Sequence, residues 1–332
     1  MPQSWPDVRQ ILEMANGFRA ACVLGAAAEL DLFTLLGDRS LSAEQLAVEL
    51  TGDLRATRML LDALAALQLL DKQDANYQVP EPLRPLLIEG SPRTVLPMIR
   101  HTMVIQRHWA QLAAVVQSGR PATRQTSIRG AEADRAAFIA AMHSISGPVA
   151  DDLVGRLMPL DLTHVLDVGG ASGTWTLAFL RAAPAARATI FDLPDAVEQA
   201  RQRIGASEFA PRVQFVAGDF YQDELPAGAD FAWVSAIAHQ HDRAHNRELY
   251  AKVFRALERG GLIGIRDLVM DSSRTRPSDG ALFAINMLVN TETGGTFTLE
   301  EFREDLEAAG FVDVRQKVKT EDMNSVVLAR KP

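Results

Sequence analysis

Three acidic residues stand at comparable places in the second half of the chain. Asp167, Asp192 and Asp219 each follow a short apolar run with the composition of a buried strand. Amphipathic stretches separate these runs, so we expect parallel strands whose carboxyl ends meet at one edge of a sheet. A tight turn with helix-capping acids explains one such position, but three in succession indicate a shared ligand.

The first of these acids opens a glycine-rich turn. The turn has the sequence D-V-G-G-A-S-G over residues 167–173, between a buried strand and a helix expected at 175–182. Its residues Gly169, Gly170 and Gly173 let the backbone approach a ligand closely. A carboxylate at the mouth of the turn would repel the pyrophosphate of a dinucleotide, whereas it suits a ligand that carries an ammonium group and a sulfonium.

The next two acids extend this hypothesis. Asp192 lies about twenty residues beyond the turn, where an acid can accept hydrogen bonds from ribose hydroxyls, and Leu193 follows it. Asp219 could accept a hydrogen bond from an adenine amino group, while Phe220 covers the face of the ring. Sulfonium, ammonium, ribose and adenine together indicate S-adenosylmethionine as the cofactor.

A histidine ends the fourth expected strand, at the same sheet edge. His239 follows the apolar run at 233–238, on which Ser235 is placed with the cofactor-binding residues. Methyl transfer to a weak nucleophile requires removal of its proton, and a phenol with a pKa of about 10 needs a base at neutral pH. Histidine is the usual base, so His239 is the candidate.

Strands and helices that alternate from residue 162 onward predict a doubly wound α/β fold. The strands are expected at 164–168, 188–191, 213–216, 231–235 and 262–265. Near the end, the strand-like runs 311–318 and 325–329 are separated only by a polar turn. Such a connection is too short to cross over, so this last pair should be antiparallel.

Residues 1–100 have a different, mostly helical pattern. Ser42 and Gln45 form a capping box, and Asp53 can cap the next helix. Two short strand-like runs around a polar turn follow. Two helices and a β-wing together predict a winged-helix domain.

Two further helices are expected at 94–118 and 131–158. They connect the two halves of the chain and are expected to contribute to the substrate pocket. We therefore divide the chain into 1–100, 101–158 and 159–332.

The combination of motifs resembles the class I S-adenosylmethionine-dependent methyltransferases, specifically the small-molecule O-methyltransferases with an N-terminal dimerisation domain. The turn resembles the family's D-V-G-G-G-x-G, with Ala171 in place of the middle glycine. The further matches are D-L-P at 192–194, G-D-F at 218–220, L-x-x-G-G at 257–261 without the family's proline, and A-G-F at 309–311. The resemblance covers nearly the whole chain. It implies a Rossmann-like sheet of seven strands with the last one antiparallel, and a first domain that pairs two chains.

By this resemblance His239 matches the catalytic histidine of the family's L-H-D-W segment. Gln240 replaces the Asp after it, and His241 replaces the Trp. Asp267 falls where family members often carry an acid that orients the histidine. A second such acid usually follows a Gly-Gly pair, but here Thr-Phe follows the pair at 294–295. A role for His239 in shaping the substrate pocket therefore stays open beside its role as base.

The resemblance also implies residues that contact the acceptor. In a segment that resembles the family's F-x-x-x-M, Met142 and Ser146 take the places that approach cofactor and acceptor, and His143 is adjacent. Asn286 and Met287 lie on the helix that covers the pocket in the family. An apolar stripe on a helix is more often core, but an amide there needs a partner, which a substrate oxygen could supply.

Charge argues against nucleic acid as a partner. The chain of 332 residues has a net charge of −8, and residues 1–100 hold nine Lys or Arg against thirteen Asp or Glu, a net of −4. Phosphate contacts require more positive charge, so we favour a homodimerisation domain over a DNA-binding regulator. Val23, Leu24, Ala27, Leu30 and Leu32 would form the paired apolar face.

The remaining expectations concern location and metal. Cys22 is the single cysteine, which excludes an intrachain disulfide and favours the cytoplasm. We find no signal peptide and no apolar run of about 18 residues without charge, so no membrane partner is expected. His241 and His245 have the spacing of a zinc helix, but the glutamate of that motif is missing, so no metal is assigned. Carbon or nitrogen methylation, or another use of the same cofactor, stays open.

Overall fold

The structure is a computed structural model that describes residues 5–170 and 172–332, apart from the side chains of residues 143–145. Its contacts divide the chain into two compact units, each with its own apolar core. The first unit comprises residues 1–107 and 124–144, and the second comprises residues 108–123 and 145–332. The threefold division expected from the sequence stays a prediction.

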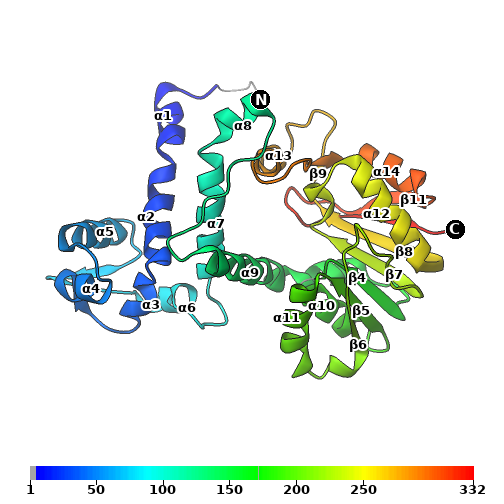
Figure 1. Cartoon of the computed structure of the whole chain (residues 1–332), viewed down its shortest axis with the longest axis horizontal. Helices are drawn as coiled ribbons and strands as arrows, with labels where there is room; N and C mark the ends of the chain where they lie inside the picture. Colours follow the sequence, from blue (N-terminus) through cyan, green and yellow to red (C-terminus); the bar gives the residue numbers. More distant parts are fainter. Residues whose placement is uncertain (1–4, 171) are drawn as a thin grey trace. The chain divides into compact units, whose positions relative to one another are not determined.

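The first unit is mostly helical and contains a small antiparallel sheet in the order β1-β3-β2 (Figure 1). The predicted helix caps are present, because Ser42 and Gln45 form the capping box of α4 and Asp53 accepts a hydrogen bond from the Ala56 amide at 2.8 Å. Its elements are α1 (Val8–Asn16), α2 (Phe18–Glu29), α3 (Leu32–Leu36), β1 (Leu41–Ser42), α4 (Ala43–Glu49), α5 (Leu54–Ala66), β2 (Asp71–Gln73), β3 (Asn76–Gln78), η1 (Glu81–Leu83), α6 (Arg84–Leu87), most of α7 (Leu96–Trp109) and the first half of α9 (Ala131–Leu157).

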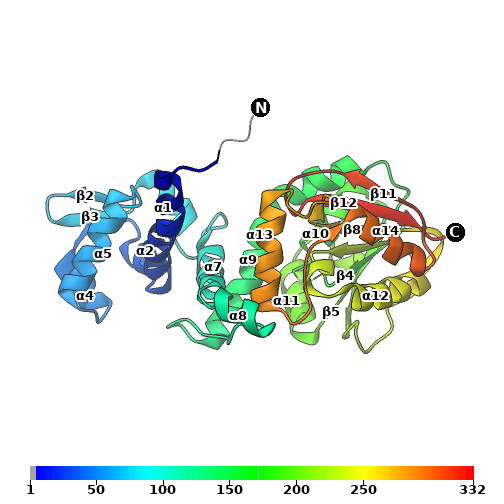
Figure 2. The same ribbon diagram turned by 90° about the horizontal axis from the view of Figure 1, so that it is seen from above.

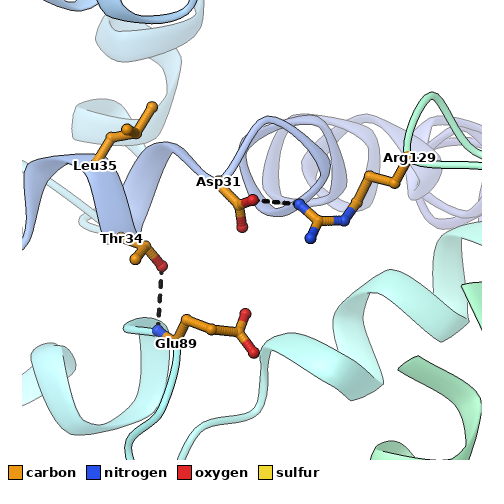
Figure 3. Close-up of a pocket in the computed structure, with 5 residues that line it drawn as sticks. All are labelled: Asp31, Thr34, Leu35, Glu89 and Arg129. Carbon is orange, nitrogen blue, oxygen red and sulfur yellow. Dashed lines mark hydrogen bonds and ion pairs between the residues drawn. The ribbon is translucent and has the colours of Figure 1, made fainter. Parts of the chain in front are cut away.

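A cluster of charged side chains surrounds the junction between α2 and α3. Arg100 is 7% exposed and donates hydrogen bonds to the Ala28 carbonyl (3.0 Å) and to Glu89 (2.6 Å). Asp31 pairs with both Arg100 and Arg129, and it holds a left-handed φ of 55°. Figure 3 shows the cavity of about 260 Å³ beside this cluster, where Asp31 and Arg129 point toward each other. The ion pairs thus join three distant segments within the first unit.

The apolar face expected to pair two chains is largely used inside the first unit. Ala27 and Leu32 are completely buried in its core, and Val23 and Leu24 pack against that core. The exposed apolar face lies instead on α1, none of whose residues is buried. Its exposed apolar side chains, together with the first residue of α2, are Val8, Ile11, Leu12, Met14 and Phe18.

Among the described residues, one helical stretch, Val8–Glu29, is apolar and long enough to cross a membrane by length and composition. The expectation of no such stretch rested on a run free of charge, and here the 18-residue window holds at most two charged residues. Length and composition alone are weak evidence, since core helices of other proteins pass the same test.

The helix predicted at 94–118 is in fact two helices, so this prediction was wrong. α7 ends at Trp109 and α8 (Leu112–Ser118) begins after Gln111. The Gln111 amide donates to the Thr123 carbonyl and accepts from the Thr123 amide, both at 3.0 Å. This contact across twelve residues accompanies a break for which the local sequence carries no Gly or Pro signal.

The second unit is built on a seven-stranded sheet in the order β11-β12-β8-β7-β4-β5-β6. β12 runs antiparallel to both of its neighbours, while β8, β7, β4, β5 and β6 are mutually parallel. The predicted doubly wound sheet with an antiparallel last strand is therefore confirmed. The strands are β4 (His164–Val168), β5 (Arg187–Asp192), β6 (Val213–Ala217), β7 (Ala229–Ser235), β8 (Leu257–Asp267), β11 (Val312–Val318) and β12 (Ser325–Arg330).

Helices cover both faces of this sheet (Figure 1, Figure 2). The end of α9, with α10 (Thr174–Ala182) and α11 (Pro194–Gly205), packs on one face, and α12 (Arg243–Ala256) and α14 (Leu299–Ala308) pack on the other. The connecting elements are η2 (Ala210–Arg212), η3 (Ala238–Gln240), β9 (Val269–Met270), α13 (Ser278–Asn290) and β10 (Phe297–Thr298). Burial on both faces explains the nearly continuous apolar runs of the central strands.

Candidate active site

His239 and Asp267 lie together at the carboxyl ends of neighbouring strands. His239 follows β7 and Asp267 ends β8. The two residues are buried, with 7% and 2% of their surfaces exposed. The imidazole Nδ1 is 3.0 Å and 3.1 Å from the two carboxylate oxygens of Asp267. Because a carboxylate only accepts, Nδ1 must carry the proton, which leaves the lone pair of a neutral imidazole on Nε2. This is the tautomer that a general base requires.

Backbone donors hold the Asp267 carboxylate in place. It accepts from the His239 amide at 3.2 Å and from the Leu268 amide at 2.8 Å. These bonds satisfy a buried carboxylate that would otherwise be costly to remove from water. Asp267 is therefore oriented by its own strand end and by the turn that carries the histidine.

The turn before His239 is strained and firmly tied. Ala236 has a φ of 58°, which is unusual for a residue with a side chain. Gln240 donates to the Ala236 carbonyl at 2.9 Å, and Asn246 donates to the Ala238 carbonyl at 2.9 Å. Gln240, which departs from the family's Asp, thus closes the turn that presents the histidine.

Two neighbouring segments contact the histidine from its other sides. The Phe283 ring of α13 lies edge-on to the imidazole, with centroids 4.9 Å apart and planes at 88°. The Gly295 amide donates to the His239 carbonyl at 2.9 Å. The loop that lacks the expected second acid therefore holds the histidine backbone, while Phe283 supplies an apolar wall.

The glycine turn leaves no room for side chains. Gly169 and Gly173 have φ values of 68° and 71°. A Cβ on Gly169 would lie 2.6 Å from Ile237 Cδ1, and one on Gly173 would lie 2.5 Å from Ile204 Cδ1. Both positions therefore require glycine, because a side chain there would meet both an unfavourable backbone conformation and the packed isoleucines.

Asp167 lies beneath this turn rather than at its mouth. It is 1% exposed, its Oδ2 accepts from the Thr176 hydroxyl at 2.6 Å, and a Cβ on Gly170 would lie 2.9 Å from its carboxyl carbon. Burial raises the pKa of Asp167 to about 7. Among the described residues no cation pairs with it, so a cationic ligand would offset the cost of its charge.

The acids after β5 and β6 lie at the same sheet edge as the glycine turn. Asp192 Oδ1 accepts from the amide of Leu193, whose side chain is 54% exposed. Asp219 accepts from the Tyr221 amide at 2.9 Å, and the Phe220 and Tyr221 rings are 4.8 Å apart. Tyr221 was missed from sequence, although an aromatic residue directly after Phe220 was a usable signal.

A cavity of about 280 Å³ opens beside this aromatic pair. It is lined by Tyr221, Gln240, His241, His245, Thr291, Glu292 and Thr293. The Tyr221 hydroxyl hydrogen-bonds to His241, and burial lowers the pKa of His241 to about 4. His241 is therefore neutral at pH 7. Across the described part of the chain, no group of three or more His, Cys, Asp or Glu could hold a metal ion.

The residues expected to contact the acceptor belong to both units. Met142 is half-buried on α9 in the first unit, and Ser146 is half-buried on the same helix in the second. His143 lies outside the described side chains. Met287 of α13 is buried, with 6% exposed.

Asn286 has a protein partner for its amide oxygen. The oxygen accepts from Trp109 Nε1 and from Asn290 Nδ2, both at 3.0 Å. His108 extends this chain, with Nδ1 2.6 Å from the Asn290 oxygen. Trp109, Asn290 and His108 carry no motif and were not found from sequence.

Comparison with known proteins identifies the family. A model of the O-methyltransferase domain matches residues 109–312, and a model of the O-methyltransferase dimerisation domain matches residues 12–81. The chain belongs to this O-methyltransferase family. It is an S-adenosylmethionine-dependent methyltransferase. The resemblance stated from the motifs is confirmed.

Individual relatives cover nearly the whole methyltransferase. It is 30% identical to the tetracenomycin polyketide synthesis 8-O-methyltransferase of Streptomyces glaucescens, over 97% of this chain and 96% of the relative. It is 32% identical to the acetylserotonin O-methyltransferase of Bos taurus, over 96% of each. The solved human N-acetylserotonin methyltransferase in complex with S-adenosylmethionine is 26% identical, with a TM-score of 0.82, covering 100% of this chain and 99% of that one.

The residues at the sheet edge fit this cofactor. The buried Asp167 carboxylate, which has no cationic partner among the described residues, suits a positively charged ligand. Acids at the ends of the next two strands could accept hydrogen bonds from a ribose and an adenine.

Proposed function

We propose that this methyltransferase acts on a hydroxyl of an aromatic or polyketide-like small molecule, with His239 as the general base. The observation that carries the proposal is the buried contact of His239 Nδ1 with Asp267, 3.0 Å long. It directs the Nε2 lone pair to the reacting hydroxyl and stabilises the imidazolium that forms when the proton arrives.

For this reaction the protein must align the acceptor hydroxyl with the methyl group and remove the hydroxyl proton. When bound, S-adenosylmethionine would supply a methyl group activated by its sulfonium, with the sulfur leaving as a neutral thioether as the methyl group bonds to the acceptor oxygen. His239 Nε2 takes the hydroxyl proton, Asp267 accepts from Nδ1 and stabilises the imidazolium, and Phe283 excludes water from one side of the imidazole. The product is the methyl ether, and the proton leaves through the imidazole.

We assign the cofactor to the sheet edge around the glycine turn. Asp167 would balance its positive charge from below, and Asp192 and Asp219 would accept from the ribose and the adenine. The remaining assigned contacts are Gly169, Gly170, Gly173, Leu193, Phe220, Ser235 and Ser146. Their positions at strand ends, in the turn or on α9 support the assignment.

The acceptor assignment follows from relatives and from α13. The named relatives act on a tetracenomycin polyketide and on acetylserotonin, and a third, 29% identical, is a 3-hydroxy-5-methyl-1-naphthoate 3-O-methyltransferase of Streptomyces sahachiroi. We propose Met142, His143, Asn286 and Met287 as acceptor contacts. Because the Asn286 oxygen already accepts from Trp109, its side chain would be held in a fixed orientation when it contacts the acceptor.

We propose that the protein is a homodimer that pairs through α1. The dimerisation-domain model matches residues 12–81, and α1 leaves a row of apolar side chains uncovered. Such a face favours burial against a partner over exposure to water. A Leu12→Glu variant should run as a monomer in sedimentation, whereas unchanged mass would contradict this interface.

The base assignment is tested by His239→Ala. We expect kcat to fall by about 10²–10⁴ for a phenolic acceptor, with cofactor affinity by calorimetry changed less than about threefold, because the imidazole acts on the proton alone. His101→Gln, in the first unit, is the matched control. A loss of only a few-fold would remove His239 as an essential base.

A second candidate is methylation of an amine. The N,N-dimethyltransferase OxyT of Streptomyces rimosus is 28% identical over 98% of this chain, and the loop at 294–297 has no second acid. A neutral amine needs no base, so the His239→Ala variant would then keep most of its activity on amines. A mass-shift screen of phenols and amines with labelled cofactor separates the two candidates.

A further inference from the structure

A second charged residue lies within the strand ends that carry the site. Arg266 precedes Asp267 on β8 and is only 3% exposed. Its guanidinium donates to Ser235 Oγ at 3.2 Å and to Asn324 Oδ1 at 3.0 Å. It lies 4.7 Å from the centre of the Trp175 ring.

None of these partners is a carboxylate. Within the described residues Arg266 has no ion pair, and Asp267 and Asp322 act on it only through space. Burial lowers the pKa of Arg266 to about 10, so the guanidinium stays charged at neutral pH. A buried charge without a paired carboxylate is a poor stabilising device, since an apolar side chain of similar size usually costs less. Its position therefore calls for another reason.

The contacts of Arg266 join the parts of the site. Trp175 lies in the first turn of α10, directly after the glycine turn. Ser235 ends β7, and the next residue, Ala236, donates its amide to the Arg266 carbonyl at 2.9 Å. The strained turn before His239 is thus hydrogen-bonded to the Arg266 backbone at Ala236. The Arg266 side chain contacts Trp175 of α10, the helix that follows the glycine turn.

We propose that Arg266 is a positioning residue for methyl transfer, which fixes the ends of β7 and β8 and whose positive charge opposes protonation of His239. The proposal rests on the proposed role of His239 as base. The Arg266 charge interacts with Asp267 through space, and a cation there favours the ionised carboxylate and opposes a second positive charge on the imidazole hydrogen-bonded to it. The ionised carboxylate and the neutral imidazole are the forms in which the dyad accepts a proton.

Other titratable groups around the dyad do not supply this effect. Tyr250 of α12 faces Asp267, but burial raises its pKa well above the usual value, so it stays neutral. His241 is neutral at pH 7. On α13, Phe283 contacts the imidazole and has no charge. Glu292 lines the same cavity as Gln240 and is negative. Asp305 is negative as well, and its charge acts on Tyr250. Arg266 adjoins Asp267 on β8, and its charge interacts with that carboxylate through space.

The test follows the titration of the His239 ring by NMR in histidine-labelled protein, with the signal assigned from a His239→Gln variant. Arg266→Met removes the charge and keeps the packing on Trp175, while Arg266→Lys keeps the charge. We expect the His239 midpoint to move up by about 0.5–1 pH unit in Arg266→Met and by less than about 0.2 unit in Arg266→Lys. An Arg266→Met midpoint equal to that of the native protein would overturn the proposal.

This readout needs no turnover, so it is separate from the test of the proposed function. If His239→Ala keeps its activity, the base assignment fails while the NMR shift still decides the effect of Arg266. If both hold, the acid limb of kcat/KM should move up with the NMR midpoint, a change that a merely structural role would not produce. Arg266→Gln, which keeps an amide donor for Asn324, replaces Arg266→Met if the latter does not fold, with the same expected shift.

Discussion

Each unit buries an arginine, and the groups that offset the cost of removing its charge from water differ between the two. Arg100 in the first unit pairs with Asp31 and Glu89 and also donates to a backbone carbonyl. Arg266 in the second unit contacts a hydroxyl, an amide oxygen and an indole face. The first arrangement joins segments of the chain, whereas the second leaves a positive charge on the residue before Asp267, the proposed partner of His239. Pairing thus separates a structural cation from one that acts on its neighbours.

The largest expected effect concerns the acid of the dyad. Asp267→Asn should lower kcat on a phenol by about 10³–10⁴, because an amide can direct its NH₂ to Nδ1 and select the wrong tautomer. The measurement is single-turnover mass spectrometry at saturating cofactor. Asp271→Asn, on an exposed loop beyond β8, serves as the control. Activity within tenfold of the native value would show that the dyad does not depend on this carboxylate.

The next effect concerns the buried acid under the glycine turn. The pKa of Asp167 is raised from 3.8 to about 7, so the folded state binds the proton more tightly than the unfolded state. Its ionisation therefore costs nothing below pH 4, costs increasingly more between pH 4 and 7, and reaches at most about 4 kcal/mol above pH 7. Asp167→Asn should raise the melting temperature of the cofactor-free protein at pH 8 and leave it nearly unchanged at pH 4.

A second test of Asp167 measures how much the cofactor stabilises the protein at different pH values. A bound cation would offset the charge, so the stabilisation of the native protein by S-adenosylmethionine should grow from pH 6 to pH 8. In Asp167→Asn this growth should disappear and the affinity should fall. A pH-independent thermal shift in the native protein would place the cofactor charge elsewhere.

A smaller effect on stability is expected at the paired arginine. Arg100→Met should lower the free energy of unfolding of the chain by about 1–3 kcal/mol, since Glu89 loses its Arg100 partner, Asp31 keeps only Arg129, and the Ala28 carbonyl loses a donor. It should leave kcat unchanged. Denaturant titration with parallel kinetics measures both quantities. A matching drop in kcat would contradict the separation of structural and functional cations.

The smallest stability effect is expected at the unpaired arginine. Arg266→Met should change the free energy of unfolding by less than about 1 kcal/mol, because removing an unpaired buried charge offsets the hydrogen bonds lost to Ser235 and Asn324. Its effect should appear in pH dependence instead. If Arg266→Met destabilised the protein more than Arg100→Met, the comparison between the two units would be reversed.

Much of the site was predictable because its signals are local. The spacing of Asp167, Asp192 and Asp219 after apolar runs placed all three at one sheet edge, and the alternation of strands and helices predicted the sheet that holds them. His239 was found in the same way, from its position at the end of a strand. Glycines at 169 and 173 indicated a tight turn, and the structure shows that a side chain at either position would clash. Such patterns depend on neighbours in sequence, and a short stretch determines them.

The tertiary structure decided what these residues touch. The depth of Asp167 beneath the turn, the pairing of Nδ1 with Asp267 across 28 residues, and the neutral partners of Arg266 all depend on segments far apart in the chain. The break of the helix at Gln111 and the hydrogen bond from Trp109 to Asn286 likewise involve residues that are distant in sequence. Sequence alone determined the turn, the strand ends and the order of the chemistry-bearing residues. Only packing determined their partners, since long-range contacts set burial, and burial sets whether a charge is paired, neutral or left to act on its neighbours.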